Sequence, residues 1–171
     1  MTGVRGTVAP GFKMSAGSSP AFLDREVAEH GDPGAQLAAY VDGRRVVDLW
    51  SDALPGDDPT GVFSISKGAP LLSEATAAEF ATPYSPGPDL VTGEPDHFGL
   101  GFETVRQKYP YLGAGAFGHG GAAGGMGWAD PASGVAYGYV RRRFAWPPGG
   151  GAAENEALGA AIVRLAARTE R

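Results

Sequence analysis

A serine and a lysine three residues apart give this sequence its clearest chemical signal. Ser64 and Lys67 lie in Val62–Gly68 (VFSISKG), which we expect to start a helix that Pro70 ends after little more than one turn. On a helix, such side chains share a face, so the Lys67 ammonium can hydrogen-bond the Ser64 hydroxyl. A lysine whose pKa is lowered by burial or nearby positive charge can then take the serine proton. The alternative is an N-cap serine beside an exposed lysine.

His119 is the second candidate for chemistry. It lies among Gly118, Gly120 and Gly121, and the missing Cβ atoms would let the backbone approach a ligand closely. The imidazole could act as a general base, or bind a carboxylate or hydroxyl group of a substrate. A structural histidine on a glycine-rich strand is an equal alternative.

Composition limits the classes of partner and cofactor. The 171 residues carry a net charge of −5 and no cysteine, and the isoelectric point is near 5.1. This charge argues against nucleic acid and anionic membrane surfaces as partners, and we interpret Arg141–Arg143 as a solvated strand end. The histidines lack metal-ligand spacing, and we expect no metal or other cofactor. Without an N-terminal apolar segment or a run of about 18 apolar residues, we expect a soluble, cytoplasmic protein.

Apolar periodicity and turn residues predict one α+β domain over residues 1–171. Asp42-Gly43 is a strong two-residue hairpin signal, and Asp130–Gly134 is expected to turn the last hairpin. The predicted strands are Ala35–Val41, Arg45–Trp50, Phe98–Val105, Ala122–Trp128 and Val135–Phe144. The predicted helices are Ser18–His30, Val62–Gly68, Ser73–Glu79 with a weak capping signal, and a C-terminal helix from about Ala153. An extended arm over residues 1–17 precedes them. The C-terminal helix carries an apolar face of Leu158, Ala161, Ile162 and Leu165. The expected fold is a five-stranded antiparallel sheet with N- and C-terminal helices on one face.

Five segments, in this order along the chain, give the sequence a family resemblance. They are Ala38–Trp50 (AAYVDGRRVVDLW), Val62–Gly68 (VFSISKG), Phe98–Phe102 (FGLGF), Phe117–Pro131 (FGHGGAAGGMGWADP) and Val135–Val140 (VAYGYV). Together they resemble the β-lactamase-related carboxylesterases, close relatives of the class C β-lactamases, over most of the chain. The S-x-x-K spacing of Ser64 and Lys67 is the nucleophile motif of serine β-lactamases and penicillin-binding proteins.

The resemblance implies a role for each matching residue. Ser64 would be the acylated nucleophile and Lys67 its partner. The segment His119-Gly120-Gly121 would stand where the family has its K-T-G or H-x-G strand, lining the site opposite the serine. The oxyanion hole would use the backbone N–H of Ser64 and of a residue near Ala122 to Ala123. The substrate-binding residues would be Gly120, Gly121, Ala122 and Tyr84.

The sequence also departs from the family pattern. Relatives carry a long, mostly helical region after the S-x-x-K helix, whereas here Gly68 runs almost directly into the segment equivalent to residues 71–73. We therefore interpret the helical lid as deleted, together with the Y-x-N motif; Tyr84-Ser85-Pro86 has its tyrosine without the asparagine. A missing lid would leave Lys67 exposed and weak as a base. It would also uncover an apolar face, so we expect a homodimer or higher oligomer that covers it.

These features favour a serine hydrolase acting on a small ester, lactone or amide. Ser64 would attack the substrate, and Lys67, alone or together with His119, would accept the proton of its hydroxyl and pass it to the leaving group. One alternative is a pocket redirected to a non-hydrolytic biosynthetic step, such as cyclisation or isomerisation. Another is a non-catalytic ligand-binding or interaction domain, which the loss of the Y-x-N region favours. A fragment without a function of its own is the remaining alternative.

Overall fold

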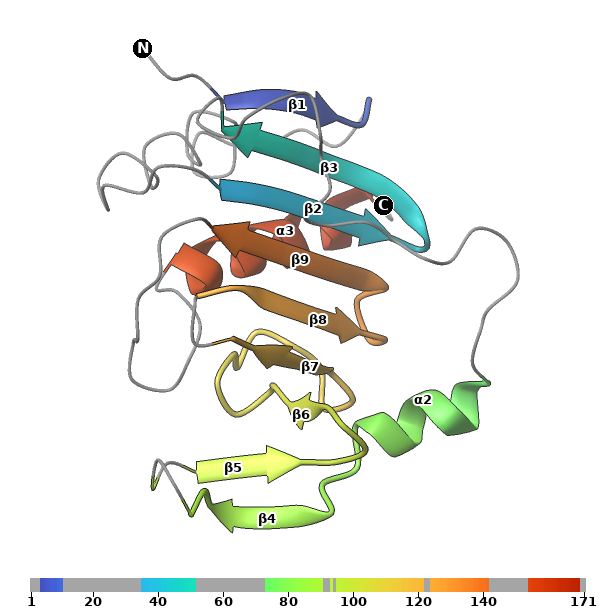
Figure 1. The fold of residues 1–171 in the computed structure, drawn as a ribbon. Coiled ribbons are helices and arrows are strands. Elements are labelled where there is room, and N and C mark those ends of the chain that lie inside the picture. The colour runs from blue at the N-terminus through green and yellow to red at the C-terminus, as the bar shows by residue number, and fades with distance from the viewer. Residues whose placement is uncertain are drawn as a thin grey trace.

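One antiparallel sheet organises the part of the chain that the computed structural model describes, which comprises residues 4–10, 35–51, 73–90, 93, 95–121, 124–141 and 154–169. Within these residues nine strands lie in the order β1-β3-β2-β9-β8-β7-β6-β5-β4, and all neighbours are antiparallel (Figure 1). The strands are β1 (Val4–Val8), β2 (Ala35–Val41), β3 (Arg44–Ser51), β4 (Ser85–Pro88), β5 (Pro95–Phe98), β6 (Glu103–Thr104), β7 (Phe117–Gly120), β8 (Met126–Asp130) and β9 (Val135–Arg141). The helices are α2 (Glu74–Phe80) and α3 (Glu154–Thr169).

Two tight turns build the central hairpins of the sheet. Asp42 and Gly43 join β2 to β3, and both have positive φ, 47° and 73°, as a type I′ turn requires. Asp130–Gly134 joins β8 to β9, where the Ser133 hydroxyl donates to the Asp130 carboxylate over 2.7 Å. Both predicted hairpins are confirmed.

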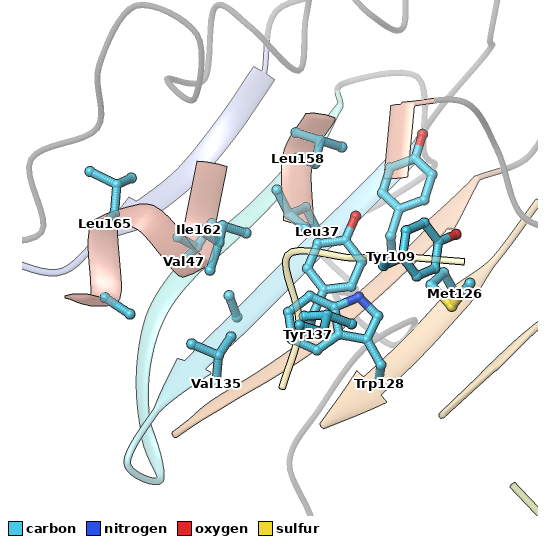
Figure 2. Close-up of a cluster of buried hydrophobic side chains, with 14 of the residues drawn as sticks. Leu37, Val47, Tyr109, Met126, Trp128, Val135, Tyr137, Leu158, Ile162 and Leu165 are labelled. Atoms are coloured by element: carbon cyan, nitrogen blue, oxygen red, sulfur yellow. The ribbon is translucent and has the colours of Figure 1, made fainter. Parts of the chain in front are cut away.

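The main core lies between the sheet and α3, which runs behind β9 and β2 in the view of Figure 1. Leu158, Ile162 and Leu165 are buried on the helix face that the sequence predicted, together with Ala161. Figure 2 shows them packed over sheet residues such as Leu37, and each such aliphatic side chain contributes about 1.5–3 kcal/mol when fully buried. The C-terminal helix and its apolar face are therefore confirmed.

The short helix α2 is attached to the other end of the sheet by aromatic contacts. Its N-cap is Ser73, whose hydroxyl accepts the Thr76 backbone N–H at 3.1 Å, as the predicted capping signal requires. Its last residue, Phe80, lies 5.0 Å from the Phe102 ring and 5.7 Å from the Phe117 ring, measured between centroids. Since Phe117 begins β7, these rings place α2 next to the strand that carries His119.

The prediction of five strands is wrong, because short and glycine-rich strands show no alternating pattern. β1 lies inside the predicted arm, and β4 lies in a Pro/Gly-rich stretch where proline is tolerated at a sheet edge. The predicted strand Phe98–Val105 is divided into β5 and β6 by a bend in which Gly101 has φ 77°. The predicted strand Ala122–Trp128 begins only at Met126, and β7 precedes it as a separate strand.

Several predicted elements lie outside the described residues. These are the helix over Ser18–His30 and the helix carrying Ser64 and Lys67. The architecture that is described is thus a large antiparallel sheet with α3 across one face and α2 at one end. In the described segments, no helix is both long and apolar enough to cross a membrane.

Candidate active site

The central feature of the candidate site is the imidazole of His119 on β7. The strand pairs with β8 on one side, where His119 faces Gly127, and with the two-residue strand β6 on the other. The His119 side chain is 55% exposed. A histidine held by a paired strand, yet open to solvent, is available to a ligand.

The glycine before this histidine is required by the sheet. A Cβ at Gly118 would lie 2.6 Å from both Cα and Cβ of Trp128 on β8. No side chain fits there, since real Cβ atoms do not approach so closely. Gly118 therefore lets β7 approach the backbone of β8 closely at Trp128, whereas the sequence analysis assigned this glycine to the approach of a ligand.

A buried carboxylate lies beside the exposed imidazole. Glu103 on β6 is 3% exposed as a residue. Its Oε1 lies 2.7 Å from Nζ of Lys108, and its Oε2 lies 3.7 Å from Nδ1 of His119. The Phe98 ring packs edge-on against the imidazole with 5.2 Å between centroids. One carboxylate thus faces two basic side chains, and one of them is the candidate catalytic histidine.

The segment after β7 makes a tight turn at the end of the strand. The Gly121 N–H donates to the Gly125 carbonyl at 2.9 Å, and the Gly124 N–H donates to the Gly121 carbonyl at 2.8 Å. Gly124 has φ 85°, and a Cβ there would lie 2.6 Å from Cζ of Arg141. The turn therefore requires glycine at position 124, and the two flanking hydrogen bonds fix its ends.

The first turn of α3 holds this segment from the core side. Asn155 is fully buried; its Nδ2 donates to the Gly124 carbonyl at 3.2 Å, and its Oδ1 accepts the Tyr137 hydroxyl at 2.8 Å. The neighbouring Glu154 carboxylate accepts the Tyr139 hydroxyl at 2.9 Å and the Arg141 guanidinium at 3.1 Å. Burial raises the pKa of Tyr137 well above its usual value, so this phenol remains a donor. The site is therefore anchored to the helix–sheet core.

Comparison with known proteins adds to this geometry. The family model described as Beta-lactamase matches residues 66–161, more than half of the chain. The chain belongs to the Beta-lactamase family. A solved structure, EstA from Arthrobacter nitroguajacolicus Rue61a, is similar with 33% sequence identity and a TM-score of 0.52. That match covers 66% of this chain and 30% of EstA, so the chain spans under a third of EstA's length. A search of curated proteins finds no match.

The Beta-lactamase family model and the similarity to EstA are the two comparisons that bear on the function of this chain. The matched region contains Lys67 and the His119-Gly120-Gly121 segment, and it begins two residues after Ser64. Ser64, Lys67 and Ala122 lie outside the described residues, so their predicted roles stay predictions. Among the described residues, no three His, Asp or Glu side chains gather as a metal site would need.

Tyr84, a predicted substrate-binding residue of this Beta-lactamase domain, directly precedes the outermost strand β4. Two strands, β5 and β6, lie between β4 and β7 in the sheet order. The Tyr84 side chain is exposed, and its hydroxyl donates to the Glu79 carboxylate of α2, which raises the pKa of the phenol. Its backbone N–H donates to the Phe98 carbonyl at 2.9 Å. Tyr84 thus contacts α2 and β5, and Phe98 is the residue that connects it to His119.

Sequence reasoning missed Glu103, Lys108 and Asn155. Glu103 directly follows the FGLGF segment, and Asn155 stands in the first turn of the C-terminal helix. An acidic residue in an otherwise apolar strand and an asparagine at a helix start were the available signals. Neither signal identifies the residue that is contacted. The fold brings Glu103 next to His119, and Asn155 next to Gly124, although each pair is far apart in the sequence.

Proposed function

We propose that this Beta-lactamase domain is a serine hydrolase that acts on a small ester, lactone or amide. The observation that carries the proposal is the exposed imidazole of His119 on β7, followed directly by the Gly121–Gly125 turn, in a chain of this family. Family resemblance assigns this strand to the wall of the site opposite the nucleophile. The similarity to EstA favours an acyl ester as the substrate class.

The proposed reaction has two steps. In the first, the Ser64 oxygen attacks the carbonyl carbon, its proton passes to Lys67, and the alkoxide or amine leaves with that proton. In the second, water attacks the acyl-serine and gives a proton to the base, which passes it to the departing Ser64 oxygen, so that the acid and the free Ser64 hydroxyl are released. Backbone N–H groups of Ser64 and of a residue near Ala122 would stabilise the oxyanion in both steps.

His119 is proposed to share the handling of the proton with Lys67. A lysine is a good base near neutrality only where burial or positive charge lowers its pKa. The sequence suggests that the helical lid after Gly68 is deleted. This deletion would leave Lys67 exposed to solvent and make it a weaker base. A neutral imidazole accepts protons near neutral pH without such tuning, and His119 is open to solvent. The expected enzyme is therefore slower than a lidded relative, because water also weakens oxyanion stabilisation.

The experiment is intact-mass spectrometry after exposure to a fluorophosphonate and, separately, to an activated butyrate ester. Wild type should carry one adduct that Ser64→Ala lacks, since only an activated serine displaces the leaving group. Ser133→Ala is the matched control; it removes the hydroxyl of the β8–β9 turn and should keep the adduct. Turnover of chromogenic esters should follow the same order. Absence of any adduct on wild type would favour a non-catalytic binding domain instead.

A further inference from the structure

The buried carboxylate of Glu103 has no role in the chemistry described so far. Glu103 is on the shortest strand of the described sheet, between Phe98 on β5 and Gly118 on β7. At 3% exposure, an ionised carboxylate needs charged or hydrogen-bonding partners to offset the loss of water. Its partners among the described residues are Lys108 and His119.

The two partners occupy different oxygens of the carboxylate. Lys108 Nζ lies 2.7 Å from Oε1, a charge-assisted hydrogen bond of ordinary length. His119 Nδ1 lies 3.7 Å from Oε2, which is ion-pair range and slightly longer than a hydrogen bond. Such contacts in ligand-free sites often shorten when substrate binds. Because Lys108 holds Oε1, Oε2 is the oxygen left to accept a hydrogen bond from the imidazole.

This division of the two oxygens favours one of the two tautomers of the neutral His119 imidazole. A neutral imidazole has one N–H and one bare nitrogen, and the hydrogen bond made by one nitrogen determines the state of the other. An acceptor oxygen beside Nδ1 favours Nδ1–H and leaves Nε2 bare. The Phe98 ring packs edge-on against the imidazole, with 5.2 Å between the ring centroids.

We propose that Glu103 is a positioning residue that holds His119 as the Nδ1–H tautomer, so that Nε2 is the proton acceptor, with Lys108 fixing the carboxylate. This inference rests on the proposed hydrolase function only for its catalytic consequence. The tautomer itself is a property of the folded protein and can be measured without a substrate.

The test is long-range 1H–15N NMR of 15N-labelled protein at about pH 9, where a histidine side chain is neutral. Wild-type His119 should show the Nδ1–H pattern. In Glu103→Gln, the Lys108 ammonium should donate a hydrogen bond to the amide oxygen, so that the amide NH2 group faces Nδ1 of His119. Nδ1 must then accept a hydrogen bond from this NH2 group, and the NMR pattern should change to that of Nε2–H. The His119 signal is assigned with His119→Gln.

Two further variants separate positioning from simple damage to the fold. Lys108→Met keeps the aliphatic stem and the carboxylate, so His119 should remain Nδ1–H. In Glu103→Gln/Lys108→Met the amide oxygen is no longer held by a lysine and can turn to His119, so Nδ1–H should return. Retention of Nδ1–H in Glu103→Gln alone, with native circular dichroism, would overturn the proposal.

Ester turnover then tests the consequence for catalysis. Glu103→Gln should lower kcat about tenfold, as loss of a partner that orients a functional histidine commonly does, with KM nearly unchanged. In a His119→Gln background the same change should have no further effect on kcat, because it acts through the imidazole. An equal loss in both backgrounds would overturn the positioning role. A wild type that turns over no ester would overturn the proposed function alone, since the NMR result still decides the tautomer.

Discussion

Gly124 is the residue whose backbone geometry connects the candidate site to the core. Its φ of 85° belongs to the left-handed region, its N–H closes the turn onto Gly121, and its carbonyl accepts from buried Asn155. The Arg141 guanidinium fills the space where a side chain would otherwise be. Conformation and packing therefore both specify glycine at this position, and the two backbone hydrogen bonds hold it in place.

We predict that Gly124→Ala is destabilising, because alanine must adopt an unfavourable φ and displace Arg141. The free energy of unfolding should fall by about 1–3 kcal/mol, measured by urea titration. Gly125→Ala is the matched control, since its Cβ would lie 3.5 Å from the Tyr139 carbonyl, an ordinary contact. Equal stability of the two variants would contradict the close packing of Arg141 on the turn. Where Gly124→Ala still folds, fluorophosphonate labelling should be slower than in wild type.

Asn155 is the residue that joins α3 to the same turn, so its loss should be costly. Asn155→Ala leaves the Gly124 carbonyl and the Tyr137 hydroxyl without their partner in a fully buried place. The expected decrease in the free energy of unfolding is about 2–3 kcal/mol. Arg164→Ala, at an exposed position of the same helix, should change it by less than about 0.5 kcal/mol. A similar effect of both would mean that the Asn155 hydrogen bonds contribute nothing net.

At the scale of elements, the junction of α3 with β8 and β9 is built from aromatic side chains. The Trp128 and Tyr137 rings stack with 5.0 Å between centroids and 9° between planes (Figure 2). Tyr109 packs in the same cluster, and burial raises the pKa of its phenol to about 12. Burial also raises the pKa of Tyr137. Unlike the surface tyrosine Tyr84, these phenols are enclosed by the core.

The raised pKa values predict how stability depends on alkaline pH. An unfolded tyrosine has a pKa of about 10. Below that pH both states are protonated, and the stability contributed by the buried neutral phenols is fully present. Between about pH 10 and 12 the unfolded state releases protons that the folded state keeps, so stability must fall. Urea midpoints should decline over this window, and absorbance near 295 nm should show the buried tyrosines ionising together with unfolding. A constant midpoint up to about pH 12 would contradict this prediction.

Elements with a strong local pattern could be predicted from sequence, and elements made by long-range pairing could not. The hairpin at Asp42-Gly43, the capped helix after Ser73 and the apolar face of α3 all follow from neighbouring residues. The two residues of β6 become a strand only because β5 and β7 flank them. The same holds for the site. His119 was identified by its glycine context, whereas its carboxylate neighbour Glu103 depends on sheet order.

At the scale of the whole molecule, the two ends of the sheet differ in their cover. The α3 helix covers β2, β8 and β9, while α2 has no buried residue and touches the sheet through Phe80 (Figure 1). The large apolar side chains exposed near this second end are Tyr84 at 58%, Leu90 at 100%, Leu100 at 51% and Phe102 at 37%. We call these four residues the exposed apolar end.

We predict that the protein self-associates through this exposed apolar end, as a homodimer or a higher oligomer. Contiguous exposed apolar surface of several hundred Å² is uncommon in monomers, and a stable dimer needs about 1,200–2,000 Å² of total buried area. Size-exclusion chromatography with light scattering should give a mass above that of one chain. Leu100→Lys, which adds a charge to the exposed apolar end, should shift the protein toward monomer. Ala114→Lys, an equal change at an exposed turn, should not. A wild-type monomer at every concentration that also binds no apolar dye would contradict self-association, and would require the candidate site to work from one chain alone.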